Sequence, residues 1–269
     1  MKMFRTGPVL TAIGAVVSVF LMLPLLAVVP ISFTSKRFLS MPNGNWSSKH
    51  YTNLITDPIW LESILVSLKV GLVAAALSTT LALLFALGIW MTRPRFSGTM
   101  IGVALLPMMA PPVVSALTLY FFLKDLSDIN SLVGYDTWLG VALAHTVMVA
   151  PYAVVIIFVS LSAFDRKIDM AARSMGASVY TRMTQVVIPN IKFGIAGAFL
   201  LSFVLSWDEI GVTLFVSSVN AITLPRRMWM GLRDNVDPTV AALSVVILTI
   251  VSILIILRAL HTNFGKRNT

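Results

Sequence analysis

The sequence predicts an all-α, polytopic membrane protein with six transmembrane helices. Hydrophobic residues make up 57% of the 269 residues, charged residues only 12%, and the mean hydropathy is +0.89. A soluble domain is typically about 25% charged, so this chain lacks the polar surface that a water-facing globule of its length needs. The apolar residues also gather in six long runs, and a helix needs about 20 such residues to cross a bilayer.

Each run is predicted to be one membrane span, because its residues are apolar on all sides of a helix. The first run follows Lys2 and Arg5 as in a signal peptide, but it is longer than the about 7–15 apolar residues of a cleavable signal. We therefore expect it to remain as a span. The six predicted spans are Val9–Phe33, Ser63–Trp90, Thr99–Leu123, Thr137–Ala163, Phe193–Val219 and Pro238–Ala259.

The basic residues predict the orientation of these spans, because cytoplasmic loops carry an excess of Lys and Arg. With the N-terminus inside, twelve Lys and Arg residues fall on the cytoplasmic side and seven on the opposite side. An even number of spans then puts both termini in the cytoplasm. The loop Asn220–Asp237 opposes the rule, because it carries Arg226, Arg227 and Arg233 on the outside.

Composition excludes several functions. The net charge of +9 does not indicate nucleic-acid binding, because the basic residues lie between apolar runs and form no stripe on a soluble domain. The absence of cysteine excludes thiolate catalysis and Cys-based metal sites. The sequence also lacks a phosphate-binding loop and paired metal-ligand histidines. We therefore expect no catalytic residue, no metal and no cofactor in this chain, and its energy must come from a partner.

Prolines and turn residues add local detail. Asn43-Gly44-Asn45 predicts a turn in the first external loop. Pro107, Pro111 and Pro112 interrupt the third span. Prolines at membrane depth free backbone carbonyls that only neighbouring protein or a water-lined cavity can satisfy, so this span is predicted to lie inside a bundle.

The connection between the fourth and fifth spans predicts a small helix-turn-helix on the membrane surface. Asp165 is a candidate N-cap, Gly176 a left-handed helix stop, and Ser178 the cap of a second helix. One interpretation is an amphipathic connector held near anionic lipid. The other is a docking surface for a partner. The predicted apolar faces are Ile168, Ala172 and Met175 in the first helix, and Tyr180, Met183 and Val187 in the second, which ends at Pro189.

This connection resembles the signature loop of binding-protein-dependent ABC importer permeases. The resemblance rests on Ala171–Ala172, Gly176 and Val187–Pro189, at the spacing of the family's Glu-Ala-Ala, glycine and Ile-any-Leu-Pro positions. Met170 stands where the family has glutamate, and Asp169, one residue earlier, is a candidate to replace its charge. In the family this loop enters a cleft on the ATPase subunit. The docking residues it implies are Asp169, Met170, Ala171, Ala172, Gly176, Ile188 and Pro189.

The resemblance extends over Leu61–Leu257, where the chain is similar to permeases of spermidine and putrescine importers. It is carried by Leu106–Pro111, Ser202–Glu209 and Thr223–Pro225. It implies a type I ABC importer permease in the bacterial inner membrane, which passes a polyamine or related cation. Opines, amino-acid-like compounds and iron are alternative solutes. The implied partners are membrane lipid, an ATP-binding subunit dimer that holds ATP and Mg, a second and different permease chain, and a periplasmic solute-binding protein.

The resemblance also implies a division of the chain. Residues 1–58 hold the first transmembrane helix and the external loop. Residues 59–258 form the permease core of five helices, with the docking loop near 164–189. Residues 259–269 are a cytoplasmic tail.

Two acids, Asp208 and Glu209, fall within the fifth predicted span, where a charge costs about 2.5–3.5 kcal/mol or more. They either pair with Lys69 or with arginines near the external mouth, or they attract a cation along the translocation pathway. Aromatic faces could add cation–π contacts, although membrane-interface anchoring is the competing role for the aromatic run around Tyr120. The candidate pathway residues are Tyr120, Trp207, Asp208 and Glu209.

A competing hypothesis is an ion-coupled secondary transporter with Asp208, Glu209 and His145 as a proton relay. The sequence has no inverted repeat of the kind typical of such transporters, which weighs against this class. A lone buried histidine such as His145 is more often a hydrogen-bonded packing residue than a ligand. An intramembrane enzyme is a third class, and no paired catalytic motif supports it.

Overall fold

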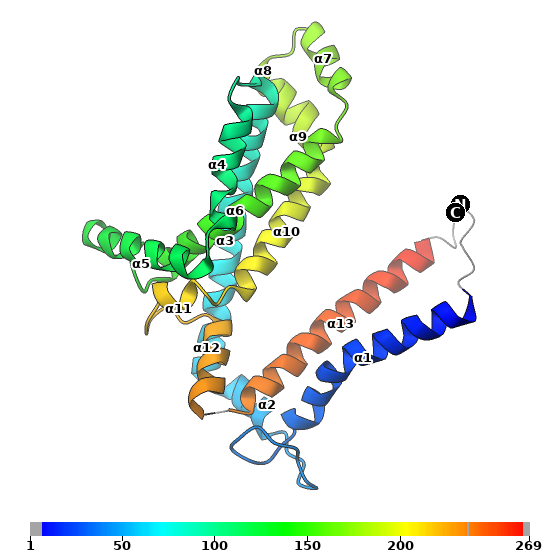
Figure 1. Ribbon diagram of the computed structural model, residues 1–269, viewed down its shortest axis with the longest axis vertical. Helices are drawn as coiled ribbons and strands as arrows, with labels where there is room; N and C mark the ends of the chain where they lie inside the picture. Colours follow the sequence, from blue (N-terminus) through cyan, green and yellow to red (C-terminus); the bar gives the residue numbers. More distant parts are fainter. Residues whose placement is uncertain (1–6, 236, 266–269) are drawn as a thin grey trace. The chain divides into compact units, whose positions relative to one another are not determined.

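The computed structural model describes residues 7–235 and 237–265, and this part of the chain is helical, with one isolated β-bridge between Thr34 and Trp46. It divides into two compact units (Figure 1). The first contains the described residues up to Leu61 and from Met228 on, and the second contains Glu62–Arg227. The predicted all-α fold is confirmed. Lys2, Arg5, Lys266 and Arg267, which entered the count of basic residues, lie outside the described residues.

The first unit consists of α1 (Pro8–Ser32), α2 (Lys49–Thr56), the π-helical turn η2 (Gly231–Asn235) and α13 (Thr239–Gly265). Polar contacts hold its loop in place, because Ser32 Oγ lies 2.7 Å from Tyr51 OH and His50 Nε2 lies 3.1 Å from the Lys36 carbonyl oxygen. Asn43 and Gly44 both have positive φ, so the predicted turn is confirmed. Almost all of α1 is exposed and apolar, as expected for a helix that faces lipid or another subunit.

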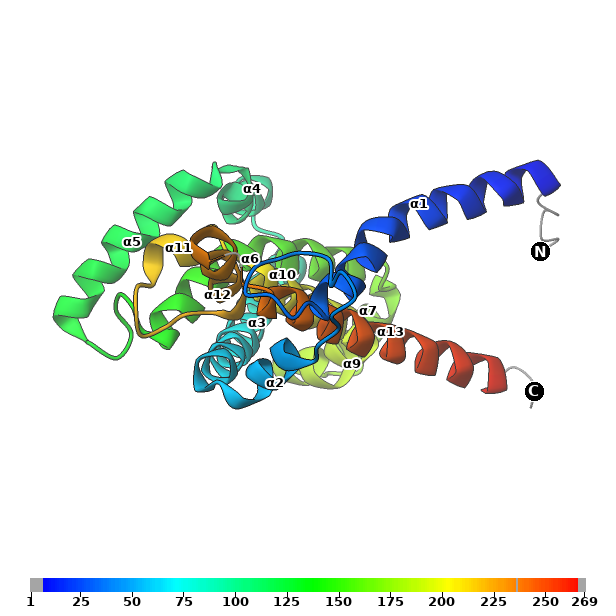
Figure 2. The same ribbon diagram turned by 90° about the horizontal axis from the view of Figure 1, so that it is seen from below.

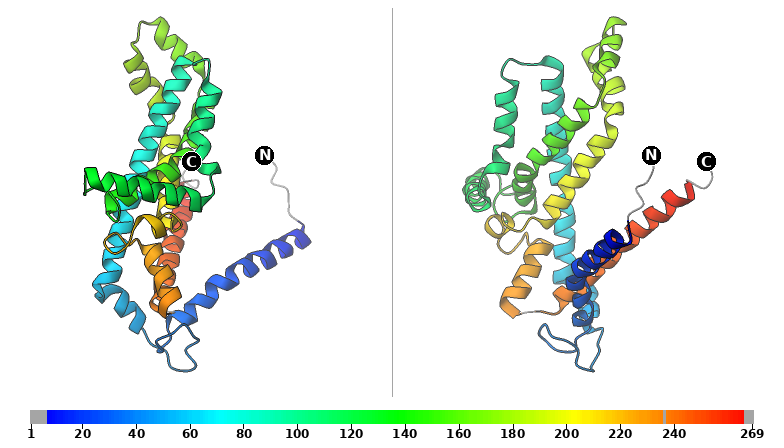
Figure 3. Two further views of the ribbon diagram at one scale, coloured as in Figure 1. Left: turned by 60° about the vertical axis from the view of Figure 1, so that its left-hand side comes forward. Right: turned by 45° about the vertical axis from the view of Figure 1, so that its right-hand side comes forward.

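The second unit begins in α3 (Pro58–Thr92) and continues through α4 (Ser97–Met109), α5 (Pro112–Ile129) and α6 (Trp138–Ser162). It ends with α7 (Arg166–Ser174), α8 (Val179–Thr181), the π-helical turn η1 (Arg182–Val187), α9 (Ile188–Asn190), α10 (Lys192–Asp208), α11 (Thr213–Val216) and α12 (Leu224–Met230), which runs into the first unit. Both panels of Figure 3 place α7 at the same end of this unit as the α3–α4 connection.

Four helices of the described residues are individually long and apolar enough to cross a membrane: α1, α3, α6 and the first twenty residues of α13. The other two predicted spans correspond to bent pairs of helices. These are α4 with α5, and Val179–Asn190 with α10. Six spans therefore exist only if each bent pair counts as one.

The third predicted span, Thr99–Leu123, is wrong as a single helix. Between α4 and α5 the chain bends by 98°, and Figure 2 views α4 end-on while α5 extends sideways. The residue before a proline is disfavoured in the α region. Ala110 (ψ 141°) and Pro111 (ψ 132°) are both extended, because each precedes a proline. The prediction that prolines interrupt this span is confirmed, but they redirect it rather than kink it.

The fifth predicted span, Phe193–Val219, also differs, because α10 ends at Asp208. Glu209 is extended (ψ 106°), and its Oε1 accepts a hydrogen bond from the Val212 backbone N–H at 2.9 Å. The apolar residues that follow therefore form a loop and the short α11 instead of continuing the helix. The acids consequently lie at the end of α10 and not within a span.

Helices α6 and α10 lie side by side and form the centre of the second unit (Figure 1). A Cβ added to Gly194 would clash with the Ser160 side chain, so only glycine permits this close approach. Two apolar clusters flank the contact. One includes Leu87, Ile157 and Leu161 near the α7 end, and the other includes Val141 and Val212 near α11.

Candidate functional site

The connection between α6 and α10 is a helical hairpin, residues 165–190, built by the caps that the sequence predicts. The Asp165 side chain accepts a hydrogen bond from Lys167 N at 2.9 Å and caps α7. Gly176 follows at φ +83°, the left-handed geometry that ends a helix. Ser178 Oγ then accepts from Thr181 N at 3.1 Å and caps the second helix. That helix ends at Asn190, one residue after Pro189.

A bidentate ion pair clamps the two arms of the 165–190 hairpin together. Arg182 Nε and Nη2 donate to the two carboxylate oxygens of Asp169 at 2.8 and 2.6 Å. Both side chains are nearly buried, with 12% of Asp169 and 11% of Arg182 exposed. These hydrogen bonds, donated by Arg182 to the Asp169 carboxylate, are the main reason that the pKa of Arg182 is raised, so the arginine stays charged. A bidentate contact of this kind fixes the relative orientation of two side chains better than a single hydrogen bond does.

The apolar faces of the hairpin differ from those predicted. Ala172 and Val187 are buried as expected, but Ile168, Met175 and Tyr180 are exposed, and Asp169 takes a buried place in α7. The clamp explains this difference, because the carboxylate must point inward to reach Arg182. The polar residue therefore faces the hairpin interior and several apolar residues face outward.

Outward-facing apolar side chains form a patch on the hairpin. Met175 is 82% exposed, Tyr180 77% and Met170 56%. Ile168 and Val179 add to the patch. Met170, which stands at the glutamate position of the resembled family, thus points away from the hairpin, whereas Asp169 points into it. Large exposed apolar side chains gathered on one short segment are typical of a surface that associates with protein or membrane.

The second arm of the hairpin is anchored in the core of the unit. Val187 is fully buried in the cluster formed by Leu87, Ile157 and Leu161, and Met183 and Ile188 pack against that cluster. The outer arm is joined to this anchored arm through the turn at Gly176 and the Asp169–Arg182 clamp. A displacement of the exposed patch would therefore also displace the residues of α3 and α6 that pack against the second arm.

The two acids at the end of α10 have different surroundings. Asp208 is exposed, whereas Glu209 is half-buried and hydrogen-bonded to the Val212 backbone. Among the described residues, neither acid has a cationic side chain within ion-pair distance, so the first of the two alternatives, pairing with Lys69 or with arginines near the external mouth, is wrong. Trp207 stacks on Phe203 with ring centroids 5.8 Å apart. Tyr120 instead contacts Tyr135 and lies under Lys124.

His145 is a buried, hydrogen-bonded packing residue, as expected for a lone histidine. Its Nδ1 lies 2.8 Å from Ser206 Oγ and its Nε2 lies 2.8 Å from Thr213 Oγ1. The Thr213 hydroxyl donates its proton to the Glu209 carbonyl oxygen at 2.8 Å. Nε2–H must therefore donate to Thr213, and Nδ1 accepts from Ser206. This network ties α6 to the end of α10 and to α11, and so positions the segment that carries both acids.

Asp136, which no sequence pattern marked, organises the loop after α11. Its carboxylate accepts hydrogen bonds from the four consecutive backbone N–H groups of residues 218–221, the shortest at 2.6 Å from Ser218. The Asn220 side chain adds another at 2.9 Å. Burial alone would raise the pKa of Asp136, but these donors outweigh it and lower the pKa below 3.8. Spacing along the chain could not signal this contact, because the partners lie more than eighty positions apart.

Replacing Asp136 by asparagine is expected to destabilise the second unit by about 1–3 kcal/mol at pH 7, because backbone donors lose a charged acceptor. A carboxylate with a lowered pKa contributes stability above its unfolded pKa and loses it as the pH falls through the folded value. The difference from wild type should therefore shrink below pH 3.8. Thermal unfolding in detergent at several pH values measures both effects. Asp128→Asn, an exposed change on α5, is the matched control, and equal losses in the two variants would contradict the role of Asp136.

Two of the three arginines that oppose the orientation rule are turned inward. Arg226 Nη1 donates to Ser217 Oγ and to the Thr213 carbonyl oxygen, and Arg227 Nε donates to Ser63 Oγ at 3.3 Å. The Leu224 backbone N–H donates to Ser67 Oγ at 2.6 Å and fixes the start of α12 on α3. These arginines hold α12 in place, which gives them a structural reason to lie on the side where the rule disfavours them.

Apolar helices around a tight central pair, with a hairpin that exposes apolar side chains at one end, define a membrane protein with a surface for association with protein or lipid. Residues 78–268 match the family described as "Binding-protein-dependent transport system inner membrane component", and the chain belongs to this family. It is therefore a permease subunit of an ABC importer.

Individual relatives agree with this assignment. The chain is 30% identical to the spermidine/putrescine transport system permease protein PotC of Haemophilus influenzae, over 92% of this chain and 93% of that protein. It is also 30% identical to the putrescine transport system permease protein PotI of Escherichia coli K12, over 87% of this chain and 83% of that protein. A bacterial ABC transporter involved in the import of the acidic polysaccharide alginate shares the fold, with a TM-score of 0.68, 12% identity, and coverage of 97% of this chain and 99% of that chain.

Proposed function

We propose that this permease forms part of a pathway through which a polyamine, such as spermidine or putrescine, or a related organic cation crosses the inner membrane. The proposal that the solute is a cation rests on Asp208. Its carboxylate is exposed at the end of a membrane helix and has no cationic partner among the described residues. Because no cationic side chain pairs with it among the described residues, the Asp208 carboxylate is available to attract a passing cation. The names of the two relatives support the same chemistry.

The 165–190 hairpin is the proposed docking site for an ATP-binding subunit. Its apolar patch is exposed in the isolated chain, and its clamped arms lead to the buried core. ATP and Mg would be bound and hydrolysed on a dimer of that partner. A second, different permease chain would complete the pathway, and a periplasmic binding protein would deliver the solute. The apolar surface of α1 is available for lipid or for such a partner.

An ion-coupled mechanism is less well supported by the geometry. Both ring nitrogens of His145 are engaged by hydroxyl groups in a fully buried site, and its Thr213 partner donates onward to a backbone carbonyl. A carbonyl oxygen has no proton to pass on, so this network does not lead to the Glu209 carboxylate.

Uptake into proteoliposomes tests the proposed function. The vesicles hold this chain, its second permease and its ATPase subunit, and the binding protein is added outside. Radiolabelled putrescine or spermidine should accumulate only with ATP inside. Preferential uptake of an opine, an amino acid or iron would overturn the polyamine assignment. Accumulation driven by a proton gradient without ATP would instead favour the secondary transporter.

The orientation has its own test. We propose that both termini and the 165–190 hairpin are cytoplasmic. The chain has no native cysteine, so single cysteines can be introduced without background. A cysteine at Ser174 should react with a membrane-impermeant maleimide only from the cytoplasm, and one at Asn45 only from outside. Both positions are exposed in the structure. Reaction of both from one side would refute the topology.

A further inference from the structure

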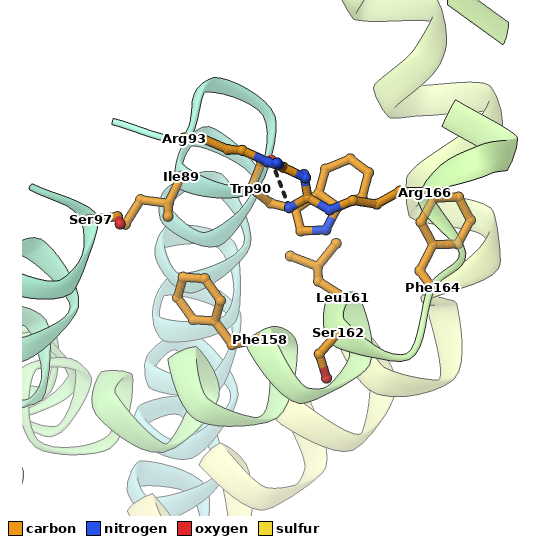
Figure 4. A pocket seen from close by; sticks show the side chains of 9 residues that line it. All are labelled: Ile89, Trp90, Arg93, Ser97, Phe158, Leu161, Ser162, Phe164 and Arg166. Carbon is orange, nitrogen blue, oxygen red and sulfur yellow. Dashed lines mark hydrogen bonds between the residues drawn. The ribbon is translucent and has the colours of Figure 1, made fainter. Parts of the chain in front are cut away.

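A pocket with two arginines opens where three membrane helices end. It has a volume of about 460 Å³ and lies between the end of α3, the start of α4 and the end of α6. Arg93 and Arg166 line it together with Trp90, and Figure 4 shows the Arg93 side chain extending toward Arg166. The volume falls within the ~300–1,000 Å³ range of small-molecule sites. We refer to this site as the arginine pocket.

The positive charge of the arginine pocket is not neutralised by the protein. Among the described residues, no carboxylate lies within ion-pair distance of Arg93 or Arg166. The nearby acids are engaged elsewhere, because Asp165 caps α7 and Asp169 is clamped to Arg182. Burial lowers the pKa of Arg166 and repulsion from Arg93 lowers it further, and together they outweigh the attraction to Asp169, which raises it. An anion between the two guanidinium groups would remove this repulsion.

Aromatic contacts hold one of the two cations in a defined position. The Arg166 guanidinium carbon lies 4.6 Å from the centre of the Trp90 ring, and its Nη2 donates to the Trp90 carbonyl oxygen at 3.3 Å. Phe164 contacts the same tryptophan, with ring centroids 5.7 Å apart. A guanidinium held in this way loses little freedom when it binds an anion.

The walls of the arginine pocket are mixed. Ser97 supplies a hydroxyl group, whereas the Ser162 hydroxyl donates to the Val159 carbonyl oxygen and points away from the arginines (Figure 4). Phe158 supplies partly exposed apolar surface, and Ile89 and Leu161 behind it are buried. The apolar helices α3 and α6 both end here, so we expect the pocket to lie near the lipid headgroups. Basic pockets between membrane helices bind acidic headgroups. A free anion would use the arginines but would leave the Phe158 ring uncovered.

We propose that the arginine pocket binds the phosphate group of an anionic phospholipid, with the adjoining acyl chain along the partly exposed Phe158. Arg166 is the first residue of α7, so the bound lipid would fix the base of the 165–190 hairpin to the membrane. This site does not depend on the identity of the transported solute.

Native mass spectrometry of the full chain in mild detergent tests the proposal. Phosphatidylglycerol should be retained more tightly than phosphatidylcholine. Arg93→Gln should weaken phosphatidylglycerol retention about fivefold, the effect of one basic residue at a lipid surface. Arg93 is exposed, so this change should leave the fold intact. Arg95→Gln removes the same charge two residues away, outside the pocket lining, and should change retention less than about twofold.

Two controls distinguish a bound phospholipid from a free anion and from general surface charge. Inorganic phosphate at the concentration of the lipid should not displace phosphatidylglycerol, and displacement would overturn the lipid assignment. Equal losses in Arg93→Gln and Arg95→Gln would indicate general surface charge and would overturn the pocket. Equal retention of phosphatidylcholine and phosphatidylglycerol would also overturn the proposed phospholipid site.

Discussion

Replacement of Gly176 by valine is expected to abolish ATP-driven uptake while the protein still inserts into the membrane. Gly176 has φ +83°, a geometry that costs an L-residue roughly 1–2 kcal/mol and that a β-branched side chain adopts least readily. A Cβ at this position meets nothing within 4 Å, so the penalty comes from the backbone alone. The strain therefore falls on the turn between the two arms of the hairpin and not on the core.

Such a small local cost can have a large functional effect because the turn sets the angle between the arms. The Asp169–Arg182 clamp and the turn together hold the shape of the hairpin, which the proposed ATPase partner would recognise. Valine would relieve its strain by opening the turn, which displaces the exposed patch of Met170, Met175 and Tyr180. The coupling between ATP hydrolysis and the membrane helices would then be lost.

Uptake assays and co-purification with the ATPase subunit measure this effect. Gly176→Asn is the matched control, because asparagine tolerates the left-handed region better than other residues with a side chain. It should keep most of the uptake that valine abolishes. Wild-type uptake by the valine variant would show that the hairpin turn is not part of the coupling.

Neutralising Asp208 should lower polyamine uptake about tenfold or more without loss of assembly. Two unit charges about 4 Å apart attract by about 4 kcal/mol at an effective dielectric constant of about 20. Desolvation of the ammonium group offsets much of this. A remaining difference of about 1.4 kcal/mol corresponds to a factor of ten. Asp208 is exposed, so Asp208→Asn removes the charge without breaking a contact that holds the fold.

Glu209→Gln separates this role from a structural one. The Glu209 Oε1 atom caps the turn before α11 through Val212 N, and glutamine keeps an oxygen that can accept this bond. We therefore expect Glu209→Gln to assemble normally and to lose less uptake than Asp208→Asn. Glu209→Ala would remove the cap and should reduce the amount of folded protein.

The uptake of labelled putrescine, the ATPase rate and the yield of assembled complex are measured together for each variant. Normal transport by both Asp208→Asn and Glu209→Gln would exclude the acids from the pathway. The cationic solute would then rest on similarity to other permeases alone. Loss of the complex in Asp208→Asn would instead indicate a structural acid.

Local chemistry explains which predictions succeeded. Four single-helix spans, the turn at Asn43–Gly44, and the caps and stop of the 165–190 hairpin follow from short stretches of sequence. A run of apolar residues, a carboxylate before a helix or a glycine after one acts on its own neighbours. Such features need no knowledge of the rest of the fold.

The failed predictions concern segments in which a local pattern permits more than one outcome. The apolar residues after Glu209 suit a continued helix, yet hydrogen bonds from His145 and Val212 to this segment turn it into a loop. Prolines marked an interruption of the third span, but the size of the bend depends on the extended backbone at two consecutive residues before prolines. The apolar face of α7 was misplaced because Arg182, thirteen residues away, pulls Asp169 inward.

The sequence by itself determined the class of protein, the number of apolar runs and the place of the hairpin, because all three depend on composition and on spacing within a few turns of helix. Only the tertiary structure decided which acid is free, Asp208 rather than Glu209, and which polar groups hold the fold. Asp136 with residues 218–221, and His145 with Ser206 and Thr213, pair across more than sixty positions. Their distances are set by how α6, α10 and α11 pack, and no spacing along the chain records that packing.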